Sequence, residues 1–406
     1  MLDDPSDSRL DPLHVLDADF AARPAPTLER LRRTCPVAKV RTPAGAEVWL
    51  VTRECDVRAS LLDSRIVPAG TPTRPKPGAR ALQVSLLNYA PADHARLRRL
   101  ATSCFTPSRV QAHRPVIEAI AQDLAGRLAG ERHTDLLADF AYPFAGRTVC
   151  ELFGVAQADR GRFCASSIVL VAKPPHSGEK RREATRVFED VIESEVSSRI
   201  HQVGNRSGIL SSIVTAWRDT REQVSREELL SLCGMLLQAG FETTAQMLCL
   251  AMVAILTHPP ILDRLRRSPD TAPGMLDELL RWDAPGPFVR RWAQADIEIG
   301  GTAIPAGSTV LLSIMAANRD PDDRPDPGSL DPDRAEGGRH LAFGLGPHYC
   351  MGAPLARLML EIALATLLGR HPDMALAVPA DDLPWQGTHL NRGLSALPVL
   401  ISTSSE

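Results

Sequence analysis

A long, almost uninterrupted apolar segment is the feature that most constrains the fold of this chain. Ser225 and Glu228 stand three residues apart in the capping-box pattern that begins a helix, and the next stop signal is the pair Pro259-Pro260. A helix of that length would extend for roughly 48 Å at 1.5 Å per residue. Because residues 229–241 are apolar nearly all round, we expect this helix to be buried inside a large globular fold.

Helical patterns also dominate the rest of the chain, whereas strand patterns are few and short. The predicted helices cover residues 92–104, 114–130, 180–201, 225–258, 273–282 and 353–370. The predicted strands cover residues 48–52, 297–299, 309–314 and 396–401. Two proline-rich stretches, 66–80 and 320–339, and a short break at 172–179 read as irregular. The sequence therefore predicts a mostly α fold with small β-sheets.

Composition narrows the classes of protein that the chain can belong to. It has 406 residues and a formal net charge of -3, which indicates no nucleic-acid partner. No composition break separates one part from another, so we expect a single domain over residues 1–406. The first 13 residues carry four aspartates and no apolar run, which predicts no signal peptide, no membrane anchor and a cytoplasmic location. Eight scattered cysteines without a CxxC pair favour neither disulfides nor zinc clusters.

One of those cysteines lies in a glycine-rich string directly before a predicted helix. Residues 343–352 read FGLGPHYCMG, and the helix is expected to begin near Ala353 and Pro354. A sulfur at a helix N-terminus lies near the positive end of the helix dipole, and glycines let backbone N–H groups approach it. Both effects favour the thiolate that a metal ion binds. The alternative is a buried structural cysteine in a turn.

This string matches the FGxGxHxCxG signature of the cytochrome P450 family at every fixed position. The flanking residues 340–342 and 355–357 also resemble soluble bacterial members. The resemblance implies the cytochrome P450 fold, with its long central helix over a haem b cofactor, which is iron protoporphyrin IX. It makes Cys350 the axial iron ligand, whose electron donation favours O–O cleavage. It also implies that Phe343, Gly344 and Gly352 help to bind the haem.

The long helix carries polar residues in its apolar middle. Ionisable or hydroxyl groups there are costly unless they have partners or a chemical role, and Gly240 adds a weak point. Residues 239–244, AGFETT, resemble the family element (A/G)Gx(D/E)T(T/S), in which a kinked helix passes over the haem. The resemblance implies that Thr243 hydrogen-bonds dioxygen and that Glu242 supplies protons through water. The alternative is that Thr243 bonds to a helix carbonyl and Glu242 pairs with an arginine.

Glu278 and Arg281 stand three residues apart on a predicted helix, and Arg334 lies in the second irregular stretch. Their order along the chain, between the Thr243 helix and Cys350, resembles the family's ExxR pair and the arginine that completes it. The resemblance implies a structural triad without a catalytic role. Leu330 departs from the pattern, because relatives usually carry phenylalanine there.

The two propionates of haem need basic or donor partners. By resemblance these are His94 and Arg98, which lie four residues apart on one helical face, together with Arg291 and His348. For each residue alone, the alternative is a solvated surface charge.

The sequence holds no flavin or iron-sulfur module, so we expect electrons from a ferredoxin and a ferredoxin reductase. Arg96 and Arg99 are the side chains that we expect to meet an acidic ferredoxin.

By resemblance the substrate pocket is lined by residues 66–87, 168–173, 285–289 and 391–395 and by the Thr243 helix. These segments are mostly apolar, which predicts an apolar substrate of medium size. The side chains expected to line it are Leu87, Leu236, Gly240, Phe288, Val289 and Leu394. Core packing is the alternative role for Phe288, Val289 and Leu394.

The predicted function is that of a haem-thiolate monooxygenase. It would use dioxygen and two externally supplied electrons to hydroxylate, epoxidise or couple its substrate, and natural-product biosynthesis is the family's usual setting. One alternative is a peroxide-driven peroxygenase, which needs no redox partner. Another is a non-catalytic haem-binding sensor, although such a protein has no need of the Glu242 and Thr243 pair.

Overall fold

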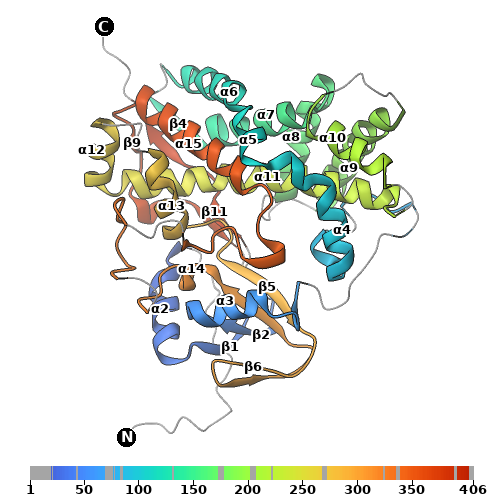
Figure 1. The fold of residues 1–406 in the computed structure, drawn as a ribbon. Coiled ribbons are helices and arrows are strands. Elements are labelled where there is room, and N and C mark those ends of the chain that lie inside the picture. Colours follow the sequence, from blue (N-terminus) through green and yellow to red (C-terminus); the bar gives the residue numbers. More distant parts are fainter. Residues whose placement is uncertain are drawn as a thin grey trace, which may run out of the picture. The chain divides into compact units, whose positions relative to one another are not determined.

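A computed structural model describes residues 20, 22–42, 44–68, 76, 78–82, 86–129, 132–171, 178–201, 207–220, 223–267, 272–322, 325–334, 339–387 and 391–401. The chain is mostly helical with small sheets, as the sequence predicts (Figure 1). It divides into two compact units. The first comprises residues 1–70, 280–349 and 385–392, and the second comprises residues 71–279, 350–384 and 393–406. A single functional domain stays a prediction.

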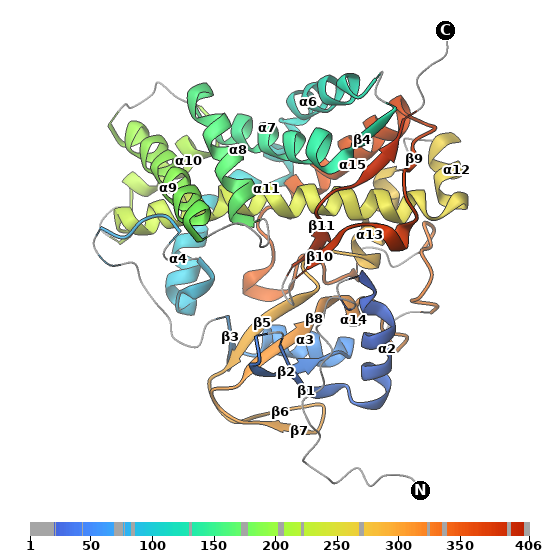
Figure 2. The same ribbon diagram turned by 180° about the vertical axis from the view of Figure 1, so that it is seen from behind.

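The first unit contains a five-stranded sheet in the order β1-β2-β8-β5-β3 (Figure 2). Strands β2 and β8 are parallel, and the other neighbours are antiparallel. The five strands are β1 (Val37–Arg41), β2 (Glu47–Val51), β8 (Thr309–Ser313), β5 (Phe288–Ala293) and β3 (Ile66–Val67). A separate hairpin joins β6 (Ile297–Ile299) to β7 (Thr302–Ile304) through Gly300 and Gly301, which both have positive φ, as a tight hairpin turn requires.

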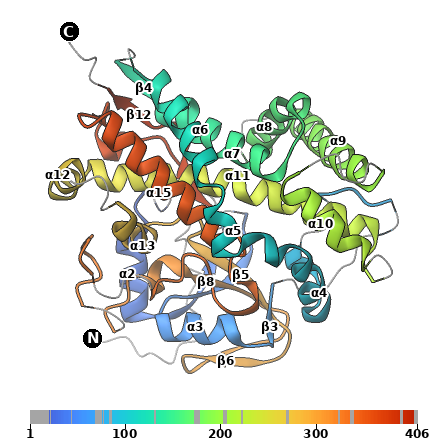
Figure 3. The same ribbon diagram turned by 45° about the horizontal axis from the view of Figure 1, so that its top comes forward.

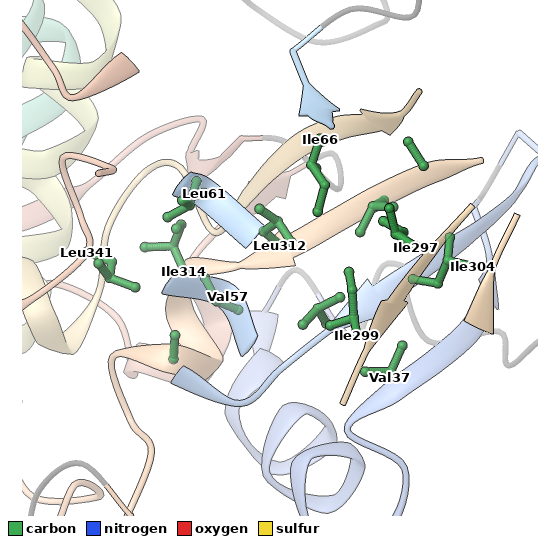
Figure 4. Close-up of a cluster of buried hydrophobic side chains, with 14 residues drawn as sticks. Val37, Val57, Leu61, Ile66, Ile297, Ile299, Ile304, Leu312, Ile314 and Leu341 are labelled. Atoms are coloured by element: carbon green, nitrogen blue, oxygen red, sulfur yellow. The ribbon is translucent and has the colours of Figure 1, made fainter. Parts of the chain in front are cut away.

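Both faces of this sheet are buried. Successive side chains of a strand point to opposite faces, so neighbouring residues of one strand belong to different clusters. Leu311 of β8 belongs to a cluster with residues of α2 (Pro24–Thr34), whereas Leu312 belongs to a cluster with residues of α3 (Glu54–Leu62). Figure 4 shows the second cluster, where Val57 and Leu61 of α3 gather with Leu312. A strand buried on both sides needs apolar residues in succession, which explains the sequence TVLLS of β8.

The second unit is arranged around the long helix α11 (Arg226–Leu256), whose predicted bounds and burial are confirmed. The predicted capping box forms: Glu228 N–H donates to Ser225 Oγ at 3.2 Å, and Ser225 N–H donates to the Glu228 carboxylate at 2.9 Å. Helices α7, α8, α9 and α15 contact α11. Its length and apolar composition would also suit a membrane span, but most of it is buried, as in the core helix of a globular protein.

Helix α15 (Ala353–Arg370) begins directly after the cysteine loop and lies beside α6 (Arg114–Arg127), as Figure 3 shows. A small sheet in the order β4-β12-β9 completes this unit and is formed by His133–Asp135, Pro398–Leu400 and Ala375–Leu376. Its other helices are α4 (Pro91–Thr102), α5 (Pro107–Gln111), α7 (Tyr142–Phe153), α8 (Gln157–Val171), α9 (Gly178–His201), α10 (Ile209–Arg218) and α12 (Pro259–Arg267). Helix α13 (Ala272–Trp282) runs from the second unit into the first.

The predicted strand 309–314 is one residue too long, because Ser313 accepts a hydrogen bond from Ala316 N–H and caps the short helix α14 (Ile314–Ala317). All six predicted helices are present, whereas α2, α3, α5, α7, α8, α10, α12 and α14 were not predicted. The predicted irregular stretches and the break near 172–179 fall partly on residues 69–75, 77, 172–177, 323–324 and 335–338, outside the described chain.

Candidate active site

The loop before Cys350 belongs to the first unit and is held by tight turns. Gly344 N–H donates to Leu341 O at 2.8 Å, and Gly344 and Gly346 both have positive φ. A side chain at residue 346 would meet Leu62 Cδ2 at 2.9 Å, so both backbone angle and space require glycine there. The ring of Phe343 lies 6.3 Å from that of Tyr349 in an edge-on arrangement. The loop is therefore a packed structure up to Tyr349, the residue before Cys350.

Cys350 begins the second unit and is a free, exposed cysteine at the N-terminus of α15. Its surroundings act on the thiol in opposite directions. Burial raises its pKa, whereas the backbone N–H groups of Gly352 and Ala353 and the charge of Arg98 lower it. The donors that favour a thiolate are thus in place, and a bound cation would supply the stabilisation that burial removes.

The middle of α11 has an exposed face although most of the helix is buried. Ala239 and Thr243, one turn apart, are exposed, and Gly240 and Glu242 are half-buried. Thr243 Oγ1 donates to Ala239 O at 2.7 Å, which is the alternative role considered for this hydroxyl. That bond leaves the oxygen lone pairs of Thr243 on the exposed face.

Gly240 does not interrupt α11, which is continuous across it. A side chain at Gly240 would meet Val149 Cγ2 of α7 at 3.2 Å, so this glycine allows the two helices to pack closely.

Helix α4 presents two of the predicted propionate partners near the cysteine. His94 is buried, and burial lowers its pKa, as does the charge of Arg98. Burial also lowers the pKa of Arg98, and the Cys350 charge partly offsets this effect. Thr102 at the end of α4 contacts Met351 Sδ at 3.8 Å, which places this helix beside the N-terminus of α15.

The prediction that Arg96 forms a ferredoxin surface is wrong. Its side chain is only 15% exposed and binds Glu228 Oε1 at 2.7 Å and Asp93 Oδ1 at 3.1 Å. Glu228, which also forms the capping box of α11, neutralises the positive charge of Arg96. That charge is therefore not available to a ferredoxin. Arg99 is exposed, so its role in partner binding stays a prediction.

In the first unit, Arg291 of β5 is a buried cation with few interactions. Burial lowers its pKa to about 10. Within the described parts of the chain no carboxylate pairs with it, and its guanidinium donates to Arg290 O at 3.0 Å. His348 is half-buried in the cysteine loop. Arg291 has the character expected of an anion ligand, because its charge is desolvated without compensation.

Two residues of the predicted triad, Arg281 and Arg334, meet at the Ser329 carbonyl in the first unit. Arg281 is buried and donates to Asn318 O at 3.1 Å, Pro327 O at 3.0 Å and Ser329 O at 2.8 Å. Arg334 donates to the same Ser329 O at 3.2 Å. Glu278 is buried one turn earlier on α13. The departure at Leu330 is accommodated, since this side chain is buried.

Asn318 links this arginine cluster to the cysteine loop and was not predicted. While its carbonyl accepts from Arg281, its side-chain Oδ1 accepts from Leu341 N–H at 2.7 Å. Leu341 in turn accepts from Gly344 N–H. The cluster therefore holds the start of the loop, which is a structural role.

The predicted pocket residues differ in their packing. Phe288 packs in the core of the first unit with its ring 5.8 Å from that of Phe20, so the structure favours core packing for it. Leu236 and Leu394 are buried, Leu87 is exposed, and Val289 packs against the α3 cluster. A role in substrate binding stays a prediction for Val289, Leu87, Leu236, Gly240 and Leu394.

Comparison with known proteins identifies the family. The family model described as Cytochrome P450 matches residues 132–275 and 272–371. The 6-deoxyerythronolide B hydroxylase of Saccharopolyspora erythraea is 37% identical over 388 residues, which cover 92% of this chain and 95% of the relative. The mycinamicin IV hydroxylase/epoxidase of Micromonospora griseorubida is 38% identical over 375 residues, covering 91% and 94%.

The structural comparison agrees. The solved cytochrome P450 PksS of the Bacillus subtilis bacillaene polyketide synthase superposes with a TM-score of 0.87 at 32% identity, covering 96% of this chain and 100% of PksS. The chain belongs to the cytochrome P450 family. It is a cytochrome P450 monooxygenase, and its cofactor is haem.

The residues of this P450 fit that cofactor within each unit. The second unit offers a cysteine sulfur with N–H donors and a cation beside it, and the first unit offers a buried arginine whose charge no described carboxylate neutralises. A sulfur ligand for iron and cations for carboxylates are the donor types that haem requires.

Two polar residues of this P450 escaped the sequence analysis, namely Tyr142 and Gln246. Gln246 Nε2 lies 3.4 Å from Tyr142 Oη and 3.0 Å from Leu394 O. The sequence did offer an indication of Gln246, because it is a second amide in the apolar run of the helix, one turn after Glu242.

Proposed function

We propose that this P450 inserts one atom of dioxygen into a mid-sized, largely apolar natural product, with electrons delivered by separate redox proteins. The observation that carries the proposal is the acid and alcohol pair Glu242 and Thr243 on the exposed face of an otherwise buried helix. Two relatives support the substrate class, because their names describe hydroxylation of 6-deoxyerythronolide B and hydroxylation or epoxidation of mycinamicin IV.

The haem would be held through its iron and its two propionates. Cys350 would bind the iron, with Phe343, Gly344 and Gly352 shaping the loop around it. His94, Arg98, Arg291 and His348 would bind the propionates. When bound, the haem supplies the activation of dioxygen that no amino-acid side chain can provide.

Glu242 and Thr243 would transfer protons from water to dioxygen. Insertion of one oxygen atom sends the other to water, which consumes two electrons and two protons. Thr243 Oγ1 accepts or donates hydrogen bonds on the exposed face by rotating away from Ala239 O. Glu242, half-buried beside it, would pass protons from water toward dioxygen.

The electrons would come from a ferredoxin and a ferredoxin reductase, and we propose a cytoplasmic location for all three proteins. Arg99 on α4 is the exposed cation that we assign to ferredoxin binding. Its replacement by glutamate would slow electron transfer and weaken the dependence of the rate on salt.

The iron ligand is tested by replacing Cys350 with alanine. The wild-type protein, loaded with haem, reduced and exposed to carbon monoxide, is expected to show the red-shifted absorption band of sulfur-ligated haem, and C350A is expected to lose it. The control is Cys55→Ala, which removes another exposed cysteine. A band retained by C350A would show that Cys350 is not the ligand.

The reaction type is tested at Thr243 with the probes 6-deoxyerythronolide B and mycinamicin IV. Their binding is scored by the change in the haem absorption spectrum and their products by the mass gain of one oxygen. We expect T243A to oxidise the same amount of NADPH as the wild type. A larger share of the electrons from NADPH is expected to end in hydrogen peroxide and a smaller share in oxidised product.

The matched control is Thr257→Ala. Thr257 Oγ1 donates to Val253 O at 2.7 Å near the end of the same helix, so both variants lose the same bond. A peroxide-driven peroxygenase would instead keep its peroxide-supported activity in T243A, and a haem sensor would bind probes without turnover.

A further inference from the structure

A clamped glutamine lies one turn beyond Glu242 on α11. Gln246 Oε1 accepts from Leu394 N–H at 2.9 Å, and Nε2 donates to Leu394 O at 3.0 Å. A side chain at Gly393 would lie 2.2 Å from Oε1, so the backbone of this strand approaches as closely as glycine permits. The two bonds fix which end of the amide is the donor, because only the NH₂ group can donate to the carbonyl.

The second hydrogen of that NH₂ group is directed at a phenol. Gln246 Nε2 lies 3.4 Å from Tyr142 Oη, so the phenol oxygen is the acceptor. The ring of Tyr142 stacks on Phe241 with centroids 5.3 Å apart and planes at 17°, and Phe241 is fully buried. Tyr142 is therefore fixed at both its ring and its oxygen.

The direction of these bonds determines where the phenolic proton goes. Because Tyr142 Oη accepts from Gln246, its own O–H is available to a group other than Gln246. Burial raises the pKa of Tyr142 to about 12, and the charge of Glu242 contributes the next largest effect, ahead of Cys249 and Asp135. Glu242 precedes Gln246 by one helical turn, which places these two side chains on the same side of α11.

We propose that Tyr142 is a positioning residue for proton delivery, which donates its phenolic hydrogen to the Glu242 carboxylate, directly or through one water, while Gln246 orients it. The bonds then run in one direction, from Gln246 to Tyr142 to Glu242. Such a bond would hold the Glu242 carboxylate in one orientation. This inference rests on the proton-delivering role proposed for Glu242.

The first test asks whether the Tyr142 phenol senses the Glu242 carboxylate, and it requires no turnover. The chain has only three tyrosines, so 3-fluorotyrosine labelling of the carbon-monoxide-bound holoenzyme gives three ¹⁹F resonances, and Tyr142→Phe identifies one. We expect Glu242→Gln to shift that resonance and to lower the pKa of Tyr142, because a negative charge is removed. Glu227→Gln, on the same helix, is the control. An unchanged Tyr142 resonance in E242Q would overturn the proposal.

The second test measures proton delivery. Holoenzyme is supplied with 6-deoxyerythronolide B, NADPH, spinach ferredoxin and ferredoxin reductase, and the fraction of electrons recovered as hydrogen peroxide, and not as oxidised product, is determined. Tyr142→Phe keeps the stacked ring and removes the hydroxyl, so we expect this fraction to rise severalfold. Tyr89→Phe, which removes the hydroxyl of another buried tyrosine, is expected to match the wild type.

The two proposals fail in different ways. If the wild type consumes no NADPH or lacks the band of sulfur-ligated haem, the proposed function fails. If the wild type turns over and Y142F releases the same fraction of peroxide, the role of Tyr142 alone is wrong.

Discussion

Two buried arginines of the first unit have opposite surroundings. Arg281 and Arg291 are 1% and 5% exposed. Arg281 donates to the backbone carbonyls of Asn318, Pro327 and Ser329, whereas Arg291 donates to the carbonyl of its neighbour Arg290. The chain therefore satisfies the first charge itself and leaves the second, whose pKa burial lowers to about 10, to be balanced by an anion. A buried charge indicates a ligand only when the protein has not already provided its partners.

The largest expected effect follows from removing Arg281. We expect R281A to lower the free energy of unfolding by about 3 kcal/mol or more, because the buried guanidinium is lost and three backbone carbonyls lose a charged donor. Thermal and urea unfolding followed by circular dichroism would measure this. Arg290→Ala, at an exposed position, is the control. If R281A is as stable as R290A, the assignment of Arg281 to the scaffold is incorrect.

The next largest effect is expected from replacing Arg291, and it differs in sign from the effect of replacing Arg281. We expect R291M to leave the haem-free protein as stable as the wild type or more so, since an uncompensated buried charge is removed. The lowered pKa means that this charge costs stability at every pH below about 10, and that the cost falls as the pH rises above that value.

The same variant is expected to lose haem about tenfold faster, corresponding to about 1.4 kcal/mol. Transfer of haem to apomyoglobin measures the rate. Faster unfolding of the haem-free R291M protein, with unchanged haem loss, would place Arg291 with Arg281 as a structural residue.

The smallest effect is expected at His94 of α4. Burial and the nearby charge of Arg98 lower its pKa, so the folded protein resists protonation of this side chain. Stability is therefore lost as the pH falls below the ordinary histidine value of about 6.5. His94→Asn should make the free energy of unfolding less dependent on pH between 5 and 7. An unaltered pH dependence would mean that His94 does not contribute.

Local patterns along the chain predicted much of this molecule. The capping box at Ser225 and the helix after Cys350 each depend on residues close in sequence, and both agree with the structure. The helices α7 and α8 were missed because internal glycine, proline and serine residues disturb their apolar periodicity.

The residues that sequence reasoning missed or misjudged act over long separations. Gln246 meets Tyr142 across 104 residues, and Arg96 meets Glu228 across 132. Nothing near Arg96 in the sequence indicates that Glu228 will neutralise it. Such pairings depend on how helices pack, which a single sequence does not specify.

The bond between Arg96 and Glu228 has a consequence for the geometry of catalysis. It joins α4, which carries His94 and Arg98, to the first turn of α11, which carries Glu242 and Thr243 farther along. The helix whose residues we propose to bind the propionates and the helix whose residues we propose to deliver protons thus share one anchor, the ion pair of Arg96 with Glu228. Loss of this anchor would let α4 pivot, so a substitution that touches neither haem nor substrate could still misalign both.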